Sequence, residues 1–476
     1  MIIFIVGILA IWTVLNFTDY MLKSCLVFPY ISWMEKKGVS LKLLRLQIYT
    51  TRLNRSIHLL GRRNSRFLYW WFTLGTFVSI CAVAPSVWIL VATALSMLDS
   101  ESGKKEDTLM LEPAMPGVNL PVTDILYYIF TLIICSVIHE FGHALSAVRE
   151  NVRVQGCGIF VLGIFPGAYV DMPKDQLSPL PAWRQLKIYC AGIWHNIALI
   201  IVAYLLLWCA PVTYKPLYKE HEGISVISVS KASGVTGPSG LMAGDHVVGV
   251  DNCVVSDVQS WKSCLVSAIK LPQYGFCQKS SLVQSEATSE IQGDCCRGDP
   301  NSLCFAYTDS YKKKGEVCLP ARHTIETATD LCNGTCPDGN ICLTPVLENG
   351  TKLVQVKRKN WKTMLFLGHP SELWHAVTVN RWVPRLKYLS TFPLHAYEVF
   401  LNYIISFSGA LAVLNSIPCL MLDGQWILQG IIKLLTQHLP CLKRTRKILY
   451  LVLVFSGTFL LVADVVLGFR RLWSQR

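Results

Sequence analysis

Apolar residues gather into six long runs along the chain, with few or no charges inside them. These runs are Ile2–Thr18, Leu68–Leu98, Ile125–Ile138 with a continuation to Val148, Ile188–Val212, Val399–Leu422, and Ile448–Ala463 with a continuation to Phe469. About 20 apolar residues suffice for a helix to cross the hydrocarbon core of a bilayer. The pattern predicts an α-helical polytopic membrane protein with about six hydrophobic segments. The 52% share of apolar residues argues against a purely soluble protein and excludes a disordered chain.

Two of these runs allow more than one interpretation. Leu68–Leu98 is long for one crossing and contains Pro85, so a tilted helix, a kinked helix and two half-spans are all compatible with it. The first run has no basic segment before it and no small-residue cleavage site, which favours a retained span over a removed signal peptide.

Glycines interrupt an apolar stretch from Gly156 to Val170, between the third and fourth runs. Glycine disfavours a helix, and strand-like backbone at membrane depth is stable only where protein or a water-filled cavity covers it. We therefore expect a membrane-embedded, glycine-rich β-like segment that lines an internal cavity.

One long hydrophilic insertion separates the fourth run from the fifth. Within it, Gly223–Val229 alternates like a strand, and Ser239–Val250 resembles the Gly-Leu-x-x-Gly-Asp corner and following strand of a PDZ domain. We divide the chain into N-terminal spans and loops (1–120), a first part of the membrane core (121–212), a β-rich, PDZ-like and cysteine-rich insertion (213–397), and a second part of the membrane core (398–476).

The formal net charge of +13 is concentrated outside this insertion. The insertion carries 19 basic and 16 acidic residues, whereas the loop from Asp19 to Tyr69 carries ten basic and two acidic residues. A basic loop between spans attracts anionic headgroups, so we expect membrane lipids and no nucleic acid as partners. Basic loops favour the cytosol, but the glycosylation sequon at Asn54 would be used only in the lumen, so the side of this loop stays open.

Ten of the 18 cysteines fall between Cys253 and Cys342, close to the glycosylation sequons at Asn333 and Asn349. An even, dense cluster of this kind is typical of a disulfide-rich region in an oxidising lumen. A cytosolic zinc-binding domain is the alternative, but no Cys-x2-Cys pair occurs among the ten. The sequence predicts disulfides without giving their pairing.

The motif His139-Glu140-Phe141-Gly142-His143 lies inside the third run. On a helix, positions i and i+4 share a face, so both imidazoles can point at one metal while Glu140 stands beside it as a base. Ionisable groups at membrane depth are costly unless they are paired or hold a metal. This favours a zinc site over a buried pair of hydrogen-bonded histidines.

A catalytic zinc site normally takes three protein ligands and keeps one position for water. Asp423 is the first candidate for the third ligand, because Pro418 interrupts the preceding helix and Gly424 frees the backbone, which lets the carboxylate point into the bundle. Asp464 in the last run is the competing candidate.

Three features together resemble the site-2 protease family of intramembrane zinc metalloproteases. They are His-Glu-x-x-His in one span, Asn-x-x-Pro-x-x-x-x-Asp-Gly in a later span, and a PDZ-like insertion between them. Stretches such as Ala191–Asn196, Ser408–Ala412 and Leu422–Trp426 are similar to the animal members of that family. The likeness runs from the first span to the last.

The resemblance implies that His139, His143 and Asp423 bind one zinc ion and that Glu140 is the catalytic base. It also implies that Asn196 and Asn415 hold the substrate backbone or the developing oxyanion, although hydrogen bonding between helices is the alternative for both. His195, beside Asn196, is a weaker candidate for a supporting role.

The resemblance further implies a biological setting. The substrates would be single-span precursors of transcription factors, namely sterol regulatory element-binding proteins and an endoplasmic reticulum stress-response factor, already cut by the luminal site-1 protease. Cleavage within or near the transmembrane helix would release the cytosolic fragment. The protein would lie in the Golgi or endoplasmic reticulum membrane with its cysteine-rich region in the lumen.

Two other functions are alternatives to peptide hydrolysis. A membrane metal transporter would conduct through the histidines and carboxylates of the motif, but transporters are usually built from repeated halves and no internal repeat occurs here. An inactive scaffold that captures peptides with the PDZ-like module would be expected to have lost at least one ligand.

Overall fold

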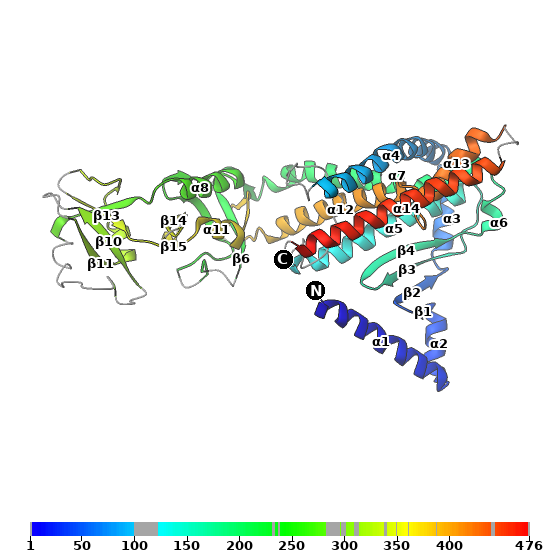
Figure 1. The fold of residues 1–476 in the computed structure, drawn as a ribbon, viewed down its shortest axis with the longest axis horizontal. Coiled ribbons are helices and arrows are strands. Elements are labelled where there is room, and N and C mark those ends of the chain that lie inside the picture. The colour runs from blue at the N-terminus through cyan, green and yellow to red at the C-terminus, as the bar shows by residue number, and fades with distance from the viewer. Residues whose placement is uncertain are drawn as a thin grey trace. The chain divides into compact units, whose positions relative to one another are not determined.

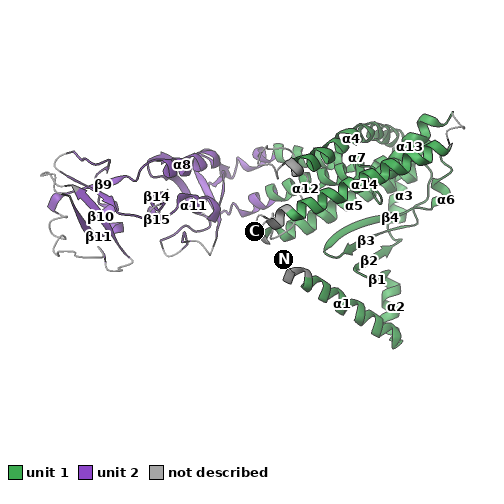
Figure 2. Ribbon diagram, in the orientation of Figure 1, with its two compact units in different colours: residues 1–209, 398–476 green, residues 210–397 purple. Residues whose placement is uncertain are grey.

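The computed structural model (Figure 1) describes residues 2–99, 122–230, 234–236, 239–281, 296, 301–308, 314–337, 340–348, 350–359, 361–386, 388–438 and 443–474. The glycosylation candidate Asn349 lies outside these residues. The chain forms two compact units, which Figure 2 shows in different colours. Unit 1 comprises Met1–Cys209 and Glu398–Arg476, and unit 2 comprises Ala210–Tyr397.

Five helices in the described part of the chain are long and apolar enough to cross a membrane. They are α4 (Ser65–Asp99), α5 (Ile125–Arg149), α7 (Ala182–Tyr214), α12 (Phe392–Ser416) and α14 (Lys443–Ser474). The protein is therefore a multi-pass membrane protein, as predicted. The first apolar run forms α1 (Ile2–Ser24), which is not among the five. Helix α4 continues through Pro85, so the apolar run Leu68–Leu98 lies in one helix and does not form two half-spans.

Shorter helices complete unit 1. They are α2 (Phe28–Lys37), α3 (Asn54–Arg62), α6 (Lys174–Leu177) and α13 (Asp423–Thr436), with a 3-10 turn at Val122–Asp124 before α5. Helix α3 packs on α5 through a cluster that includes Ile57, Ala144 and Val148, all of them buried.

Unit 1 also contains an antiparallel sheet in the order β1-β2-β3-β4 (Figure 1). Its strands are β1 (Val39–Lys42), β2 (Arg45–Thr50), β3 (Gly156–Leu162) and β4 (Phe165–Asp171). Strands β3 and β4 come from the glycine-punctuated segment, where we expected strand-like backbone. Strands β1 and β2 come from the basic loop between Asp19 and Tyr69.

The pleat gives this sheet one face that points toward α3 and α5. Two rows of residues share that face in register, namely Thr50, Cys157 and Val170 in one row and Ile48, Ile159 and Ala168 in the other. Between the rows, a Cβ on Gly158 would overlap the carbonyl oxygen of Ile48 and lie 2.7 Å from the Tyr169 ring. Glycine at this position therefore permits the strands to approach.

Unit 2 contains a larger sheet in the order β15-β14-β7-β6-β16, with β8 paired to β7. Its strands are β6 (Ile224–Val229), β7 (His246–Val250), β8 (Cys253–Val254), β14 (Lys352–Arg358), β15 (Met364–Gly368) and β16 (Val377–Asn380), and helices α8 (Val258–Lys270) and α11 (Pro370–Ala376) share its core. At the predicted Gly-Asp corner, Gly244 has a φ of +93°. Asp245 there forms a buried ion pair of 2.9 Å with Arg358.

A second sheet of unit 2 has the order β11-β10-β13-β9-β12. Its strands are β9 (Gly275–Gln278), β10 (Ser302–Thr308), β11 (Lys314–Pro320), β12 (Leu331–Cys332) and β13 (Ile341–Pro345), with α10 (Ala321–Glu326) beside them. A short pair, β5 (Tyr218–Lys219) and β17 (Val383–Pro384), completes the unit.

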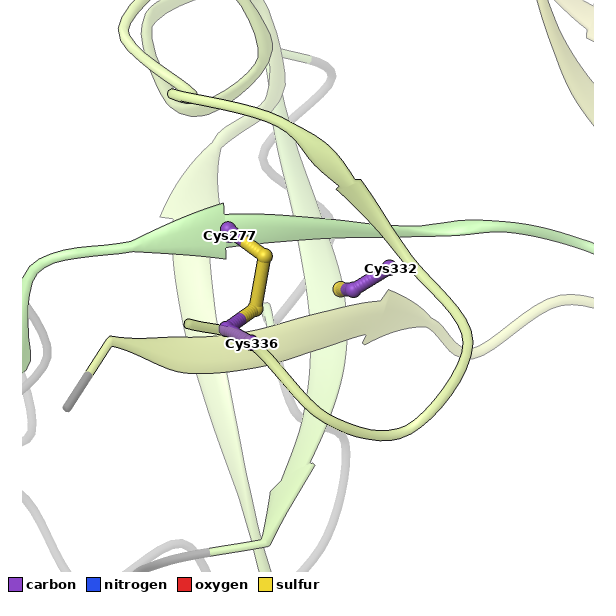
Figure 3. A group of neighbouring side chains, drawn as sticks. All are labelled: Cys277, Cys332 and Cys336. Carbon is purple, nitrogen blue, oxygen red and sulfur yellow. A yellow bond between two sulfur atoms is a disulfide. The ribbon is translucent and has the colours of Figure 1, made fainter. Parts of the chain in front are cut away.

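The predicted disulfides are present in unit 2. The described pairs are Cys253–Cys264, Cys277–Cys336, Cys296–Cys318 and Cys332–Cys342, and Cys304 is also disulfide-bonded. Three of these cysteines lie close enough together to suggest a metal site (Figure 3), but all three are in disulfides. A thiolate is needed to bind zinc, so this cluster is a pair of crosslinks.

Glycosidase treatment tests on which side of the membrane Asn54 and Asn333 lie. The Asn54 side-chain nitrogen, the atom a glycan would occupy, donates to the Gln155 carbonyl at 2.8 Å, and its Oδ1 is buried. Asn333 is exposed. We expect the glycosidase-sensitive shift in electrophoretic mobility to decrease in Asn333→Gln and to stay unchanged in Asn54→Gln. A shift that disappears in Asn54→Gln would contradict this arrangement.

Candidate metal centre

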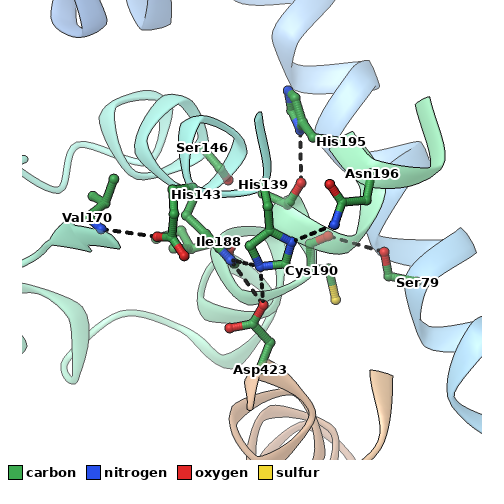
Figure 4. Close-up of polar contacts among 12 residues, drawn as sticks. Ser79, His139, His143, Ser146, Val170, Ile188, Cys190, His195, Asn196 and Asp423 are labelled. Atoms are coloured by element: carbon green, nitrogen blue, oxygen red, sulfur yellow. Dashed lines mark hydrogen bonds and ion pairs between the residues drawn. The ribbon is translucent and has the colours of Figure 1, made fainter. Parts of the chain in front are cut away.

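Helix α5 presents the two histidines of the motif from one face. His139 and His143 are both buried, and their rings meet edge to face with centroids 4.8 Å apart (Figure 4). Their Nε2 atoms are 3.1 Å apart. The helical spacing of four residues therefore brings two ligand nitrogens to one point, as the motif predicts.

The carboxylate of Asp423 reaches the same point from the first turn of α13 (Figure 4). Its Oδ2 is 2.9 Å from His139 Nε2 and 3.1 Å from His143 Nε2. Helix α12 ends at Ser416, two residues before Pro418, so the chain turns where the sequence predicts. The role of Gly424 differs from our expectation: its φ is not left-handed, but a Cβ there would overlap the carbonyl oxygen of Ile417. The glycine thus lets α13 begin against the end of α12.

The outer ring nitrogens have partners on α7. His143 Nδ1 donates to the Ile188 carbonyl oxygen at 2.7 Å, and because a carbonyl only accepts, the proton lies on Nδ1. His139 Nδ1 lies 3.1 Å from the side-chain nitrogen of Asn196, whose Oδ1 is buried and has no partner within the described part of the chain. With this amide turned over, its oxygen would accept a hydrogen bond from a protonated Nδ1 of His139.

These contacts fit a bound divalent metal ion. With the Asn196 amide turned over, both Nδ1 atoms are protonated, and the two Nε2 atoms and Asp423 Oδ2 are all lone-pair acceptors that lie 2.9–3.1 Å apart. Ligands about 2.0–2.1 Å from a tetrahedral zinc ion are themselves about 3.3 Å apart, so a small adjustment would accommodate the ion. Nitrogen and oxygen donors with protonated outer nitrogens are the set that zinc takes in proteins.

Gly192 on α7 leaves space beside the two histidines. A Cβ at this position would overlap His143 Nε2 and would lie 2.5 Å from His139 Nε2. At this position the helix therefore meets the motif with backbone alone, which keeps open the point where the ligand atoms converge.

Glu140 follows His139 directly in α5, and its side chain contacts strand β4. Its Oε2 accepts a hydrogen bond of 3.1 Å from the backbone N–H of Val170, and its Oε1 makes no hydrogen bond among the described residues. One oxygen is thus fixed by the sheet, and the other is available for proton transfer.

The other sequence candidates lie in different surroundings. Asn415 is half-buried near the end of α12, and its side chain has no hydrogen-bond partner in the described ranges. His195 Nδ1 donates to the Ala191 carbonyl at 2.8 Å within its own helix, and its ring stacks on Phe72. The competing acid Asp464 is buried in α14, but it does not belong to the group of ligands around His139.

Three contributors to the site were not predicted from sequence. They are the Ile188 carbonyl, the open position at Gly192, and the Val170 N–H. A signal for the first two existed, because residues 188, 192 and 196 are four apart and share one face of α7. The contact of Val170 with Glu140 joins distant segments and has no local signal.

Comparison with known proteins agrees with this geometry. Residues 127–460, which include both histidines, Glu140 and Asp423, match peptidase family M50. The chain belongs to this peptidase family. It is 25% identical over 461 residues to a membrane-bound transcription factor site-2 protease homolog of Arabidopsis thaliana, covering 85% of this chain and 88% of that protein. The predicted resemblance to the site-2 proteases is therefore confirmed, and no solved structure matches the chain.

Substitution of Gly192 tests the open position. We expect Gly192→Ala to weaken zinc binding at least about tenfold, because the added methyl group would overlap both ligand nitrogens. Gly409→Ala in α12 is the matched control, since its Cβ would meet nothing closer than Ile200 at 3.8 Å. Zinc content and affinity are measured on both purified proteins. Equal zinc affinity in the two variants would disprove the assignment of Gly192.

Proposed function

We propose that this chain is an intramembrane zinc metallopeptidase that hydrolyses a peptide bond within or near the transmembrane helix of a single-span protein. The observation that carries this proposal is the convergence of His139, His143 and Asp423 at 2.9–3.1 Å beside Glu140, in a chain with five candidate membrane spans. The family membership supports peptide hydrolysis as the reaction.

His139 Nε2, His143 Nε2 and Asp423 Oδ2 would hold the zinc ion. When bound, zinc polarises the scissile carbonyl and makes a water molecule nucleophilic near neutral pH. Around it, Ile188 and Asn196 hold the two imidazoles in orientation through their outer nitrogens.

Glu140 would move the proton. Its Oε1 takes a proton from the attacking water as the water oxygen bonds to the scissile carbon, and later delivers it to the amine nitrogen as the carbon–nitrogen bond breaks. The hydrogen bond from Val170 to Oε2 keeps the side chain oriented during both transfers. Water supplies both the new carboxyl oxygen and the proton on the amine, so no other reactant is needed.

The two asparagines would have different roles. The position of Asn196 against His139 favours orientation of a ligand over contact with the substrate. Asn415 has an amide with no partner among the described residues, which supports a role in holding the substrate backbone or the oxyanion.

The substrate must be unwound where it is cut, because a helix shields its own peptide bonds. Among the described residues, β4 is an edge strand of its sheet. The Val170 N–H that donates to Glu140 belongs to this strand. An extended peptide can add to such a strand through backbone hydrogen bonds. We place the unwound substrate segment here, beside Glu140.

Catalytic substitutions test this mechanism. We expect Glu140→Gln to retain one zinc ion and to lose about 10²–10⁴-fold in cleavage rate. Asp423→Asn should lose both zinc and activity, whereas the matched control Asp464→Asn should retain both. Zinc analysis and cleavage of a single-span peptide in vesicles are the measurements. Full activity in Glu140→Gln, or zinc flux without cleavage, would refute the peptidase mechanism.

The biological setting is part of the proposal. The name of the Arabidopsis relative refers to membrane-bound transcription factors, and this supports transcription-factor precursors as substrates. We propose sterol regulatory element-binding proteins and an endoplasmic reticulum stress-response factor, each already cut by site-1 protease. The protein would lie in the Golgi or endoplasmic reticulum membrane, with the PDZ-like, disulfide-rich unit 2 in the lumen, where disulfides form.

Reconstitution tests the order of cleavage. We expect vesicles containing the enzyme to release a soluble fragment from a precursor whose luminal part has been removed, and to leave the intact precursor uncut. A precursor with a scrambled transmembrane segment is the control. Equal cleavage of intact and trimmed precursors would rule out the proposed order.

A further inference from the structure

A cavity of about 370 Å³ lies in unit 1 between the four-stranded sheet and helices α3 and α5. Its size lies within the range of about 300–1,000 Å³ that is usual for ligand pockets. The sheet contributes the in-register rows that contain Ile159, Ala168 and Val170, while α3 contributes Ile57 and α5 contributes Ala144. The cavity is therefore bounded by strands on one side and helices on the other.

The lining of the cavity is apolar except at one point. Glu140 is the charged residue among the described lining residues, and the others are apolar or carry only a hydroxyl or thiol group. Ile48, Val137 and Ile159 belong to both the lining and the exposed surface, so they form an apolar rim. Apart from Glu140, these walls offer a charged occupant no partner of opposite charge, whereas an apolar occupant would lose contact with water.

The cavity and the proposed base share one residue. The backbone N–H of Val170 holds Glu140 Oε2 at 3.1 Å, and Val170 also lines the cavity. An occupant therefore lies directly against the group that would serve the reacting peptide bond. A side chain of the peptide being cut is the occupant that this placement favours.

We propose that this cavity is a specificity pocket, which receives a large apolar side chain of the substrate next to the cleaved bond. The proposal rests on the function proposed above and specifies its substrate class. A small side chain would leave most of the cavity unfilled and would gain less from burial.

Filling and widening the pocket test this proposal. Ala168→Phe adds a ring on the cavity face of β4, and Ile159→Ala removes bulk from the same face. Leu162→Phe is the matched control, because residue 162 lies on β3 but points to the opposite face of the sheet and is exposed. The substrates are reconstituted single-span peptides with alanine, leucine or tryptophan next to the cut, and the measurement is kcat/KM for each.

We expect the wild type and Leu162→Phe to cleave the leucine peptide at least about tenfold faster than the alanine peptide. Ala168→Phe should lose this preference while it still cleaves the alanine peptide and binds zinc. Ile159→Ala should shift the preference toward tryptophan, which keeps the test decisive if the phenylalanine variant does not fold.

Three results would contradict the proposal that this cavity is a specificity pocket. The first is an equal loss on all peptides in Ala168→Phe together with unchanged preference in Ile159→Ala. The second is inhibition by an added single-chain lipid that Ala168→Phe abolishes without any change in side-chain preference, which would make the occupant a lipid. The third is absence of cleavage by zinc-loaded wild type, which would overturn the proposed function and the pocket with it.

Discussion

The packing of α7 against α5 is the contact on which the site depends. Helix α7 meets the motif with one residue per turn. The Ile188 carbonyl accepts a hydrogen bond from one imidazole, Gly192 leaves room, and Asn196 contacts the other imidazole. Because each interaction needs the same registration of the two helices, a shift of one turn would remove all of them. The geometry of His139 and His143 is therefore a property of a helix pair and not of the motif alone.

The same helix contact continues beyond the motif toward the end of α5. Ser146 donates to the Lys187 carbonyl at 3.0 Å, and the buried side chains of Lys187 and Glu150 form an ion pair of 3.4 Å. Arg184 reaches Glu150 as well, at 2.9 Å. Removal of one partner from a buried ion pair costs about 3–5 kcal/mol, so this pair fixes the registration of α5 on α7 firmly. A stable helix contact thus lies directly beside a site that must bind substrate.

The sequence predicts the local part of this site and misses the non-local part. His139 and His143 could be placed because helical spacing is local, and Asp423 could be selected because helix-breaking residues surround it. The reason for Gly424 was wrong in detail, since close approach of two chain segments, not backbone freedom, requires it. The pairing of β2 with β3 joins residues that are 107 to 117 positions apart, and the hydrogen bond from Val170 to Glu140 joins residues 30 positions apart, so no local pattern could predict them. The five apolar helices were predictable because the bilayer imposes length and composition on each span separately.

X-ray absorption at the zinc edge of the purified, membrane-reconstituted protein tests the central claim most directly. The claim is that one metal ion is bound by two imidazoles of α5 and one carboxylate of α13. The predicted result is one zinc ion per chain with nitrogen and oxygen neighbours at about 2.0–2.2 Å, including the outer-shell scattering of two imidazole rings. A sulfur neighbour at about 2.3 Å, or a spectrum without imidazole scattering, would contradict it.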